Sequence, residues 1–308
     1  MLDETRSKKI TTPRKLIPNE KIVVVLDTSP VRNLAYGETP DWVSTFAEMV
    51  GDGYMFSLAD TTVAELLTQA RSKRIPEDGY GRMISSLKKF LDPMFPMLPG
   101  KIDLEAIIGL DNTVNLEETK FLSKVAWDQL LNPSASVFAL GPPLETLLEE
   151  ERDEWVSSLN EMRMTTYFHG IDLERSDPDD VAEFMADIVG RRLEDNWEVI
   201  PSMEVRMHLE LRYRFRQMAR SAQKKNSYNP ENKKNRNDGI DVDIYKYFIL
   251  PALAVATDGG FFESLCTIES FQRNWFYRPE NLAAEWIAGK RPQPIWPDAD
   301  DPDPDDIE

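Results

Sequence analysis

The sequence predicts an α/β protein built on a parallel sheet, and three short apolar segments carry this prediction. Residues 21–26, KIVVVL, form a β-branched run that is short enough for a strand buried on both faces. Residues 54–58 and 252–256 are weaker strand candidates. Polar clusters and helical patterns flank each segment, so we expect helices to flank the sheet, with a large helical insertion between the second and third strands.

Helical periodicity fills the middle of the chain. Apolar side chains fall on one face of residues 144–162, after a Gly-Pro-Pro break, and residues 121–131 are patterned in the same way. Both patterns are typical of packing faces. The expected organisation is a basic arm (1–20), a core (21–70 with 236–290), a helical insertion (71–235) and an acidic disordered tail (291–308).

Composition excludes several classes of function. A single cysteine, Cys266, rules out an internal disulfide, and it has no familiar zinc-ligand spacing to His169 or His208. The net charge of -18 opposes nonspecific coating of nucleic acid but still allows a local basic groove. We expect no membrane span and no secretory signal, and therefore a cytoplasmic protein.

The charge is unevenly distributed along the chain. Residues 206–236 contain ten Lys or Arg against two acidic residues, whereas residues 298–308 contain seven acidic residues and no cation. On a helix, a basic row with a spacing of four residues would extend about 18 Å, a length that suits several phosphates. The residues expected to bind nucleic acid are Arg212, Arg216, Arg220, Lys224, Lys225, Lys233, Lys234 and Arg236. The alternative is a surface helix that pairs with the acidic remainder of the chain.

Acidic residues follow the expected strands. Asp27 ends the first strand and Asp258 ends the third, so both would lie at the carboxyl edge of the sheet, where ligands bind in open parallel sheets. Glu65 follows the second strand, in the first turns of a helix. Asp238 and Asp241 lie three residues apart on one face of another helix.

Carboxylates gathered at one edge repel one another, so a protein that keeps them together usually holds a divalent cation there. Ligation by oxygen alone favours Mg²⁺ or Mn²⁺, as one or two ions. Simpler roles stay open for each residue: strand-end residues for Asp27 and Asp258, a solvated or capping role for Glu65, and a helix N-cap for Asp238.

The order and spacing of these motifs resemble the PIN domain, a family of metal-dependent nucleases. The matching segments are VVVLDTS at 23–29, VAELL at 63–67, NDGID at 237–241 and ATDGGFF at 256–262. By this resemblance the acidic quartet is Asp27, Glu65, Asp241 and Asp258, with Thr257 beside the last acid and Asp238 as an additional carboxylate. The resemblance implies a PIN-like sheet, and the insertion is longer than the family usually carries.

The function implied by the resemblance is hydrolysis of phosphodiester bonds, most often in RNA, by metal-activated water. Asp27, Asp241 and Asp258 would bind the ions, Glu65 would bind or orient the water, and Thr28 and Thr257 would brace carboxylates or contact phosphate. Single-stranded DNA is an alternative substrate. Such nucleases are often toxins silenced by an inhibitory protein, and many are homo-oligomers.

Two competing functions are considered. The first is a catalytically inactive PIN-like scaffold or partner-binding subunit, which the long insertion favours. The second is a phosphate-transferring hydrolase of the haloacid dehalogenase type. It is disfavoured because Thr28 and Ser29 follow Asp27, so the second aspartate of that pattern is missing.

Overall fold

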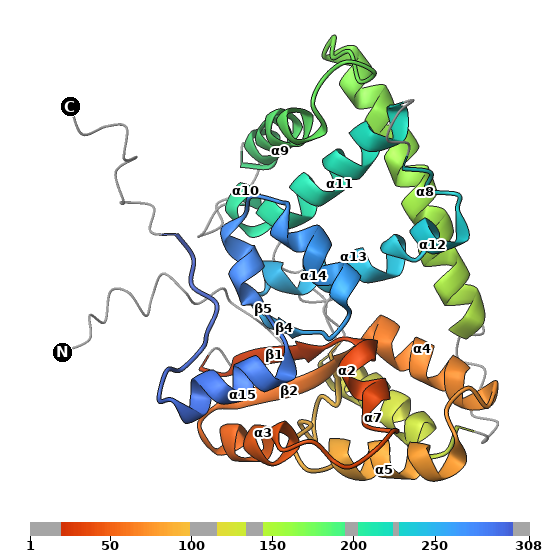
Figure 1. Ribbon diagram of the computed structural model, residues 1–308, viewed down its shortest axis with the longest axis vertical. Coiled ribbons are helices and arrows are strands. Elements are labelled where there is room, and N and C mark those ends of the chain that lie inside the picture. Colours follow the sequence, from red (N-terminus) through yellow and green to blue (C-terminus); the bar gives the residue numbers. More distant parts are fainter. Residues whose placement is uncertain (1–19, 99–115, 134–143, 195–202, 224–227, 298–308) are drawn as a thin grey trace.

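A computed structural model shows an α/β protein with a five-stranded, all-parallel sheet flanked by helices, which confirms the predicted fold class (Figure 1). It describes residues 20–98, 116–133, 144–194, 203–223 and 228–297. The strand order is β3-β2-β1-β4-β5. The chain therefore winds outward from β1 on one side and returns to its other side through β4.

The three expected strands form the middle of the sheet. They are β1 (Ile22–Leu26), β2 (Tyr54–Ala59) and β4 (Leu253–Val255). Two short edge strands, β3 (Met97–Leu98) and β5 (Phe276–Tyr277), were not expected, because two residues are too few to show a period. Val23 to Leu26 of β1 are buried, as a strand covered on both faces requires.

Helices connect the strands and cover the sheet. They are α2 (Thr28–Asn33), α3 (Trp42–Gly51), α4 (Asp60–Arg71), α5 (Glu77–Leu87), α14 (Gly259–Cys266) and α15 (Pro279–Ile287). An aromatic cluster fixes α3 against β2: the rings of Phe46 and Phe56 stack with centroids 4.5 Å apart, and Phe90 meets both rings edge-on. This packing holds the strands that carry the candidate site.

The predicted helical insertion is present between β3 and β4. Its described elements are α7 (Leu116–Leu131), α8 (Leu144–Phe168), α9 (Pro178–Glu194), α10 (Met203–Arg206), α11 (His208–Ala222) and α12 (Lys233–Arg236). Helix α13 (Asp238–Lys246), in the range expected for the core, follows it and leads to β4. In Figure 1, α8, α9 and α11 gather at the end of the molecule away from α3 and α5. The long helix α8 spans the distance between that end and α4.

Two expected boundaries differ from the structure. β3 belongs to the sheet although it lies in the range expected for the insertion, so the core extends beyond residue 70. Residues 291–297, expected to begin the disordered tail, pack onto the core. Trp296 is buried, with its ring 4.8 Å from that of Trp275, and the hydroxyl of Tyr54 donates to the carbonyl of Pro292. The apolar area of one tryptophan outweighs the acidic composition that follows it.

Other expectations lie outside the described residues. These are the basic arm up to residue 19, the acidic tail from residue 298, and Lys224 and Lys225. Among the described helices, none combines the length and apolar character that crossing a lipid bilayer requires.

Candidate active site

The candidate site lies where β1 and β4 run side by side and their chains leave in opposite directions. The amide of Asp27, directly after β1, donates to the carbonyl of Val255 at the end of β4, with an N···O distance of 2.9 Å. This is the topological switch point of the sheet, where crevices form in open α/β folds. The structure therefore brings Asp27 and Asp258 to the same edge, as the sequence predicted.

A serine bridges these two strand ends. The hydroxyl of Ser29 donates to Oδ2 of Asp27 at 2.6 Å, and it accepts from the amide of Thr257 at 2.9 Å. The amide of Ser29 also donates to Asp27, which caps helix α2. Ser29 was not singled out from the sequence. Its local signal was an aspartate followed two residues later by a hydroxyl residue at a helix start.

Thr28 connects Glu65 to the same edge. Its hydroxyl donates to Oε2 of Glu65 at 2.5 Å, so α2 and α4 are joined beside the strand ends. Burial raises the pKa of Glu65, and the charge of Asp27 adds to this; the hydrogen bond from Thr28 and the charges of Arg152 and Arg32 oppose it. The predicted bracing of a carboxylate by Thr28 is thus present, and its partner is Glu65.

Asp241 shows the strongest influence of neighbouring acids. Desolvation raises its pKa well above the ordinary value, and the charges of Asp27, Asp238, Glu65 and Asp258 raise it further. Its side chain remains reachable by solvent. Protein packed around the carboxyl group supplies this desolvation. The other four predicted carboxylates all act on Asp241.

Asp238 has a partner in the insertion. Its Oδ2 accepts from the hydroxyl of Tyr228 at 2.6 Å, and that hydroxyl accepts from the indole N–H of Trp155 at 2.9 Å. The N-cap position of α13 is Asn237, so Asp238 lies in the first turn of the helix. Its carboxylate therefore ties α13 to the buried Trp155 of α8, alongside any role at the acidic edge.

The close contact between α13 and α8 depends on Gly239. A Cβ atom at this position would lie 2.6 Å from Cβ of Trp155 and 2.8 Å from the carbonyl oxygen of Glu151. Only glycine allows the two helices to approach this closely. The insertion consequently sets the position of the helix that carries Asp241.

The donor set consists of oxygen atoms alone, which suits Mg²⁺ or Mn²⁺. Among the residues that the structure describes, no three Asp, Glu, His or Cys side chains are arranged closely enough to hold a metal ion. The carboxylates lie along one edge of the sheet and influence one another electrostatically. In the described part of the chain, no three of them lie close enough to bind the same ion. Their charge fits a divalent cation, and rotation of exposed side chains such as Asp258 would be needed to close a coordination sphere.

The predicted basic row on α11 faces α9. Arg216 pairs with Asp179 at 2.7 Å and Arg212 with Glu183 at 3.9 Å, and their side chains are only 17% and 15% exposed. Arg220 donates to Gln217 and lies over the ring of Tyr228. The structure thus shows the alternative arrangement considered for this row, pairing within the acidic chain. Binding of nucleic acid by these residues stays a prediction.

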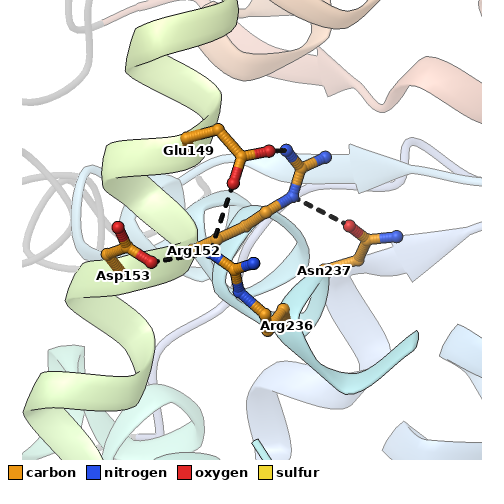
Figure 2. A network of polar contacts seen from close by, with 5 residues as sticks. All are labelled: Glu149, Arg152, Asp153, Arg236 and Asn237. Atoms are coloured by element: carbon orange, nitrogen blue, oxygen red, sulfur yellow. Dashed lines mark hydrogen bonds and ion pairs between the residues drawn. The ribbon is translucent and has the colours of Figure 1, made fainter. Parts of the chain in front are cut away.

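Arg236 lies elsewhere, at the end of α12, and Arg152 of α8 lies beside it (Figure 2). Arg236 pairs with Asp153 at 2.6 Å and with Glu149 at 3.2 Å. Lys233 and Lys234 belong to the same short helix α12. The sequence pointed to Arg236, but not to Arg152, which lies in a helix that otherwise reads as a packing element.

Comparison with protein-family models, curated proteins and solved structures found no match for this chain. The residues and their geometry therefore carry the functional argument alone.

Proposed function

We propose that the protein is a metal-dependent nuclease of the PIN type that hydrolyses phosphodiester bonds, with RNA as the first substrate to test. The observation that supports this most is the position of Asp241. Desolvation raises its pKa, and four other carboxylates at the switch point of the parallel sheet raise it further: Asp27, Glu65, Asp238 and Asp258. A protein gains nothing in stability from such repulsion, so the cluster favours a cationic ligand.

In this proposal, different residues bind the metal ions, orient the attacking water and position the ligands. Asp27, Asp241 and Asp258 hold one or two Mg²⁺ or Mn²⁺ ions, with Asp238 as an additional carboxylate. Bound metal supplies a Lewis acid that lowers the pKa of water and stabilises charge on phosphate oxygens. Glu65 orients the attacking water, because Thr28 fixes its other carboxylate oxygen. Ser29 and Thr257 keep Asp27 in place between the strand ends.

Cleavage of mixed RNA and of single-stranded DNA with added Mn²⁺ or Mg²⁺ tests this proposal. We expect Asp27→Asn and Asp258→Asn each to reduce the rate on the order of 100-fold or more. Glu48→Gln, an exposed acid on α3, is the matched control and should leave the rate unchanged. Cleavage that persists in both aspartate variants, or that needs no divalent ion, would reject the proposed site.

A second candidate, a scaffold that acts through association, is favoured by exposed apolar side chains at the end of α8. Tyr167 and Phe168 are 75% and 80% exposed, and Met164 is 59% exposed. Light scattering on the wild type and on Tyr167→Ser/Phe168→Ser tests self-association through this end. A monomer in both cases, together with metal-dependent cleavage, would leave the nuclease as the sole candidate.

A further inference from the structure

A cleft of about 580 Å³ opens between α4, α8 and α12, and it begins at the acidic edge. Glu65 lines it from the side of the candidate active site. The other charged side chains in its wall are Arg74, Glu149, Arg152, Glu231 and Arg236. Three cations thus meet three anions, which makes this cleft far less acidic than a chain with a net charge of -18.

Two arginines in this wall form ion pairs with the same carboxylate. Figure 2 shows Glu149 between them: Oε1 lies 2.5 Å from Nη1 of Arg152, and Oε2 lies 3.2 Å from Nη2 of Arg236. Neighbours fix the direction of both guanidinium groups. Nε of Arg152 donates to Oδ1 of Asn237 at 3.0 Å, and Arg236 also pairs with Asp153. We name Arg152 and Arg236 the arginine clamp.

The arginine clamp is electrostatically connected to the candidate active site. The two arginines and Glu65 line the same cleft, and the positive charge of Arg152 opposes the rise in the pKa of Glu65 that burial causes. Asn237, which accepts from Arg152, directly precedes the helix that carries Asp241. A ligand held by the clamp would therefore lie beside the acidic edge.

An anionic oxygen pair between two guanidinium groups is the arrangement by which arginines recognise phosphate as well as carboxylate. Glu149 is exposed, so a competing anion can reach and replace it. The side chains of Arg152 and Arg236 are 22% and 31% exposed, which leaves their outer N–H groups accessible. Each guanidinium group also has a contact that does not involve Glu149: Arg152 with Asn237 and Arg236 with Asp153.

We propose that the arginine clamp binds a backbone phosphate of single-stranded nucleic acid, and that Glu149 occupies the phosphate position until the strand displaces it. The inference rests on the proposed nuclease function and names its substrate form. The cationic wall of the cleft supports a single strand, because a groove lined by cations can follow an unpaired backbone. The exchange of Glu149 for phosphate makes and breaks only ion pairs and hydrogen bonds.

Fluorescence anisotropy tests the clamp without cleavage. The full-length protein is titrated into labelled RNA and DNA hexanucleotides of one sequence at low salt in EDTA. We expect Arg152→Ala and Arg236→Ala each to weaken binding about tenfold, because charge-assisted bonds to phosphate are lost. Glu149→Gln should tighten binding severalfold, whereas Glu150→Gln, the exposed neighbour on the same helix, should leave it unchanged. Binding of either strand with this pattern supports the proposal.

Several results would overturn the clamp. They are wild-type affinity in Arg152→Ala at unchanged thermal stability, weaker binding in Glu149→Gln, equal binding of a duplex, or binding of neither strand. Arg152→Lys keeps the charge and loses the planar fork, so it gives a second variant if Arg152→Ala is unstable. Clamp-dependent binding without metal-dependent cleavage would reject the nuclease and keep the clamp. Cleavage that ignores all clamp variants would do the reverse.

Discussion

Two groups of arginines in this protein both pair with carboxylates, but they lie in different places relative to the candidate active site. The row on α11 faces α9, where Arg216 and Arg212 pair with Asp179 and Glu183. The arginine clamp, Arg152 with Arg236, faces a cleft that begins at Glu65. The regular row stands out in the sequence, but Arg212 and Arg216 pair with α9. The clamp, whose members are 84 positions apart, points toward the candidate active site.

The difference shows that a run of cations in the sequence does not by itself predict which of these side chains a ligand can reach. That depends on which helices pack against them. In a chain with 54 acidic and 36 basic residues, carboxylates are available to pair with arginines. Arg212 and Arg216 pair with acids of α9, and Arg152 and Arg236 pair with Glu149. The acidic partners of the α11 row, Asp179 and Glu183, are as exposed as Glu149. What distinguishes the clamp is that Glu65 of the candidate active site lines the same cleft.

The largest expected effect comes from Gly239→Ala, which would disrupt the packing of α13 against α8, the helix that carries Arg152. The added Cβ would collide with Trp155 and with the backbone of Glu151, so α13 must move away from α8. We expect a loss of about 1–3 kcal/mol in the free energy of unfolding, measured by urea denaturation. The control, Gly81→Ala in α5, meets nothing within 4 Å and should be neutral or stabilising.

The next largest effect is expected when one arginine of each group is replaced by alanine and hexanucleotide binding is measured. Arg152→Ala should weaken hexanucleotide binding about tenfold, or about 1.4 kcal/mol. Arg216→Ala should leave it unchanged, because Arg216 already pairs with Asp179 on the buried side of α11. Equal losses in the two variants would mean that the α11 row also contacts the strand, as the sequence predicted.

In contrast to nucleic-acid binding, the free energy of unfolding should depend on the α11 row. Arg216→Ala removes a partly buried ion pair between α11 and α9, so we expect about 1 kcal/mol of destabilisation. Arg175→Ala is the control, because its side chain is 88% exposed and its ion pair with Asp172 lies at the surface. A thermal shift no larger than that of the control would contradict a packing role for the row.

The smallest effect concerns pH and His208, beside the row. Desolvation, with a contribution from the charge of Arg212, lowers the pKa of His208 from 6.5 to about 4. Between these values the unfolded chain binds a proton that the folded protein does not, so stability rises with pH across this window. We expect His208→Gln to flatten that rise by less than about 1 kcal/mol, after allowance for partial exposure. Parallel pH profiles would contradict it.

Much of the sheet could be predicted because strand patterns are local. The β-branched run of β1 marks a doubly covered strand. Asp27 follows β1 directly and Asp258 lies shortly after β4, so parallel pairing brings them to one edge. The edge strands β3 and β5 could not be found, because each contributes two residues and owes its conformation to a neighbour.

The sequence by itself determined the α/β class, the three central strands and the acidic residues that reach one edge, since these follow from periodicity and from residue type at strand ends. Tertiary structure alone decided the rest. The bridge through Ser29, the contact of Gly239 with Trp155, the pairing of α11 with α9 and the clamp around Glu149 each join segments whose proximity depends on helix packing. Such contacts arise from shape and burial summed over many residues, and no local pattern encodes them.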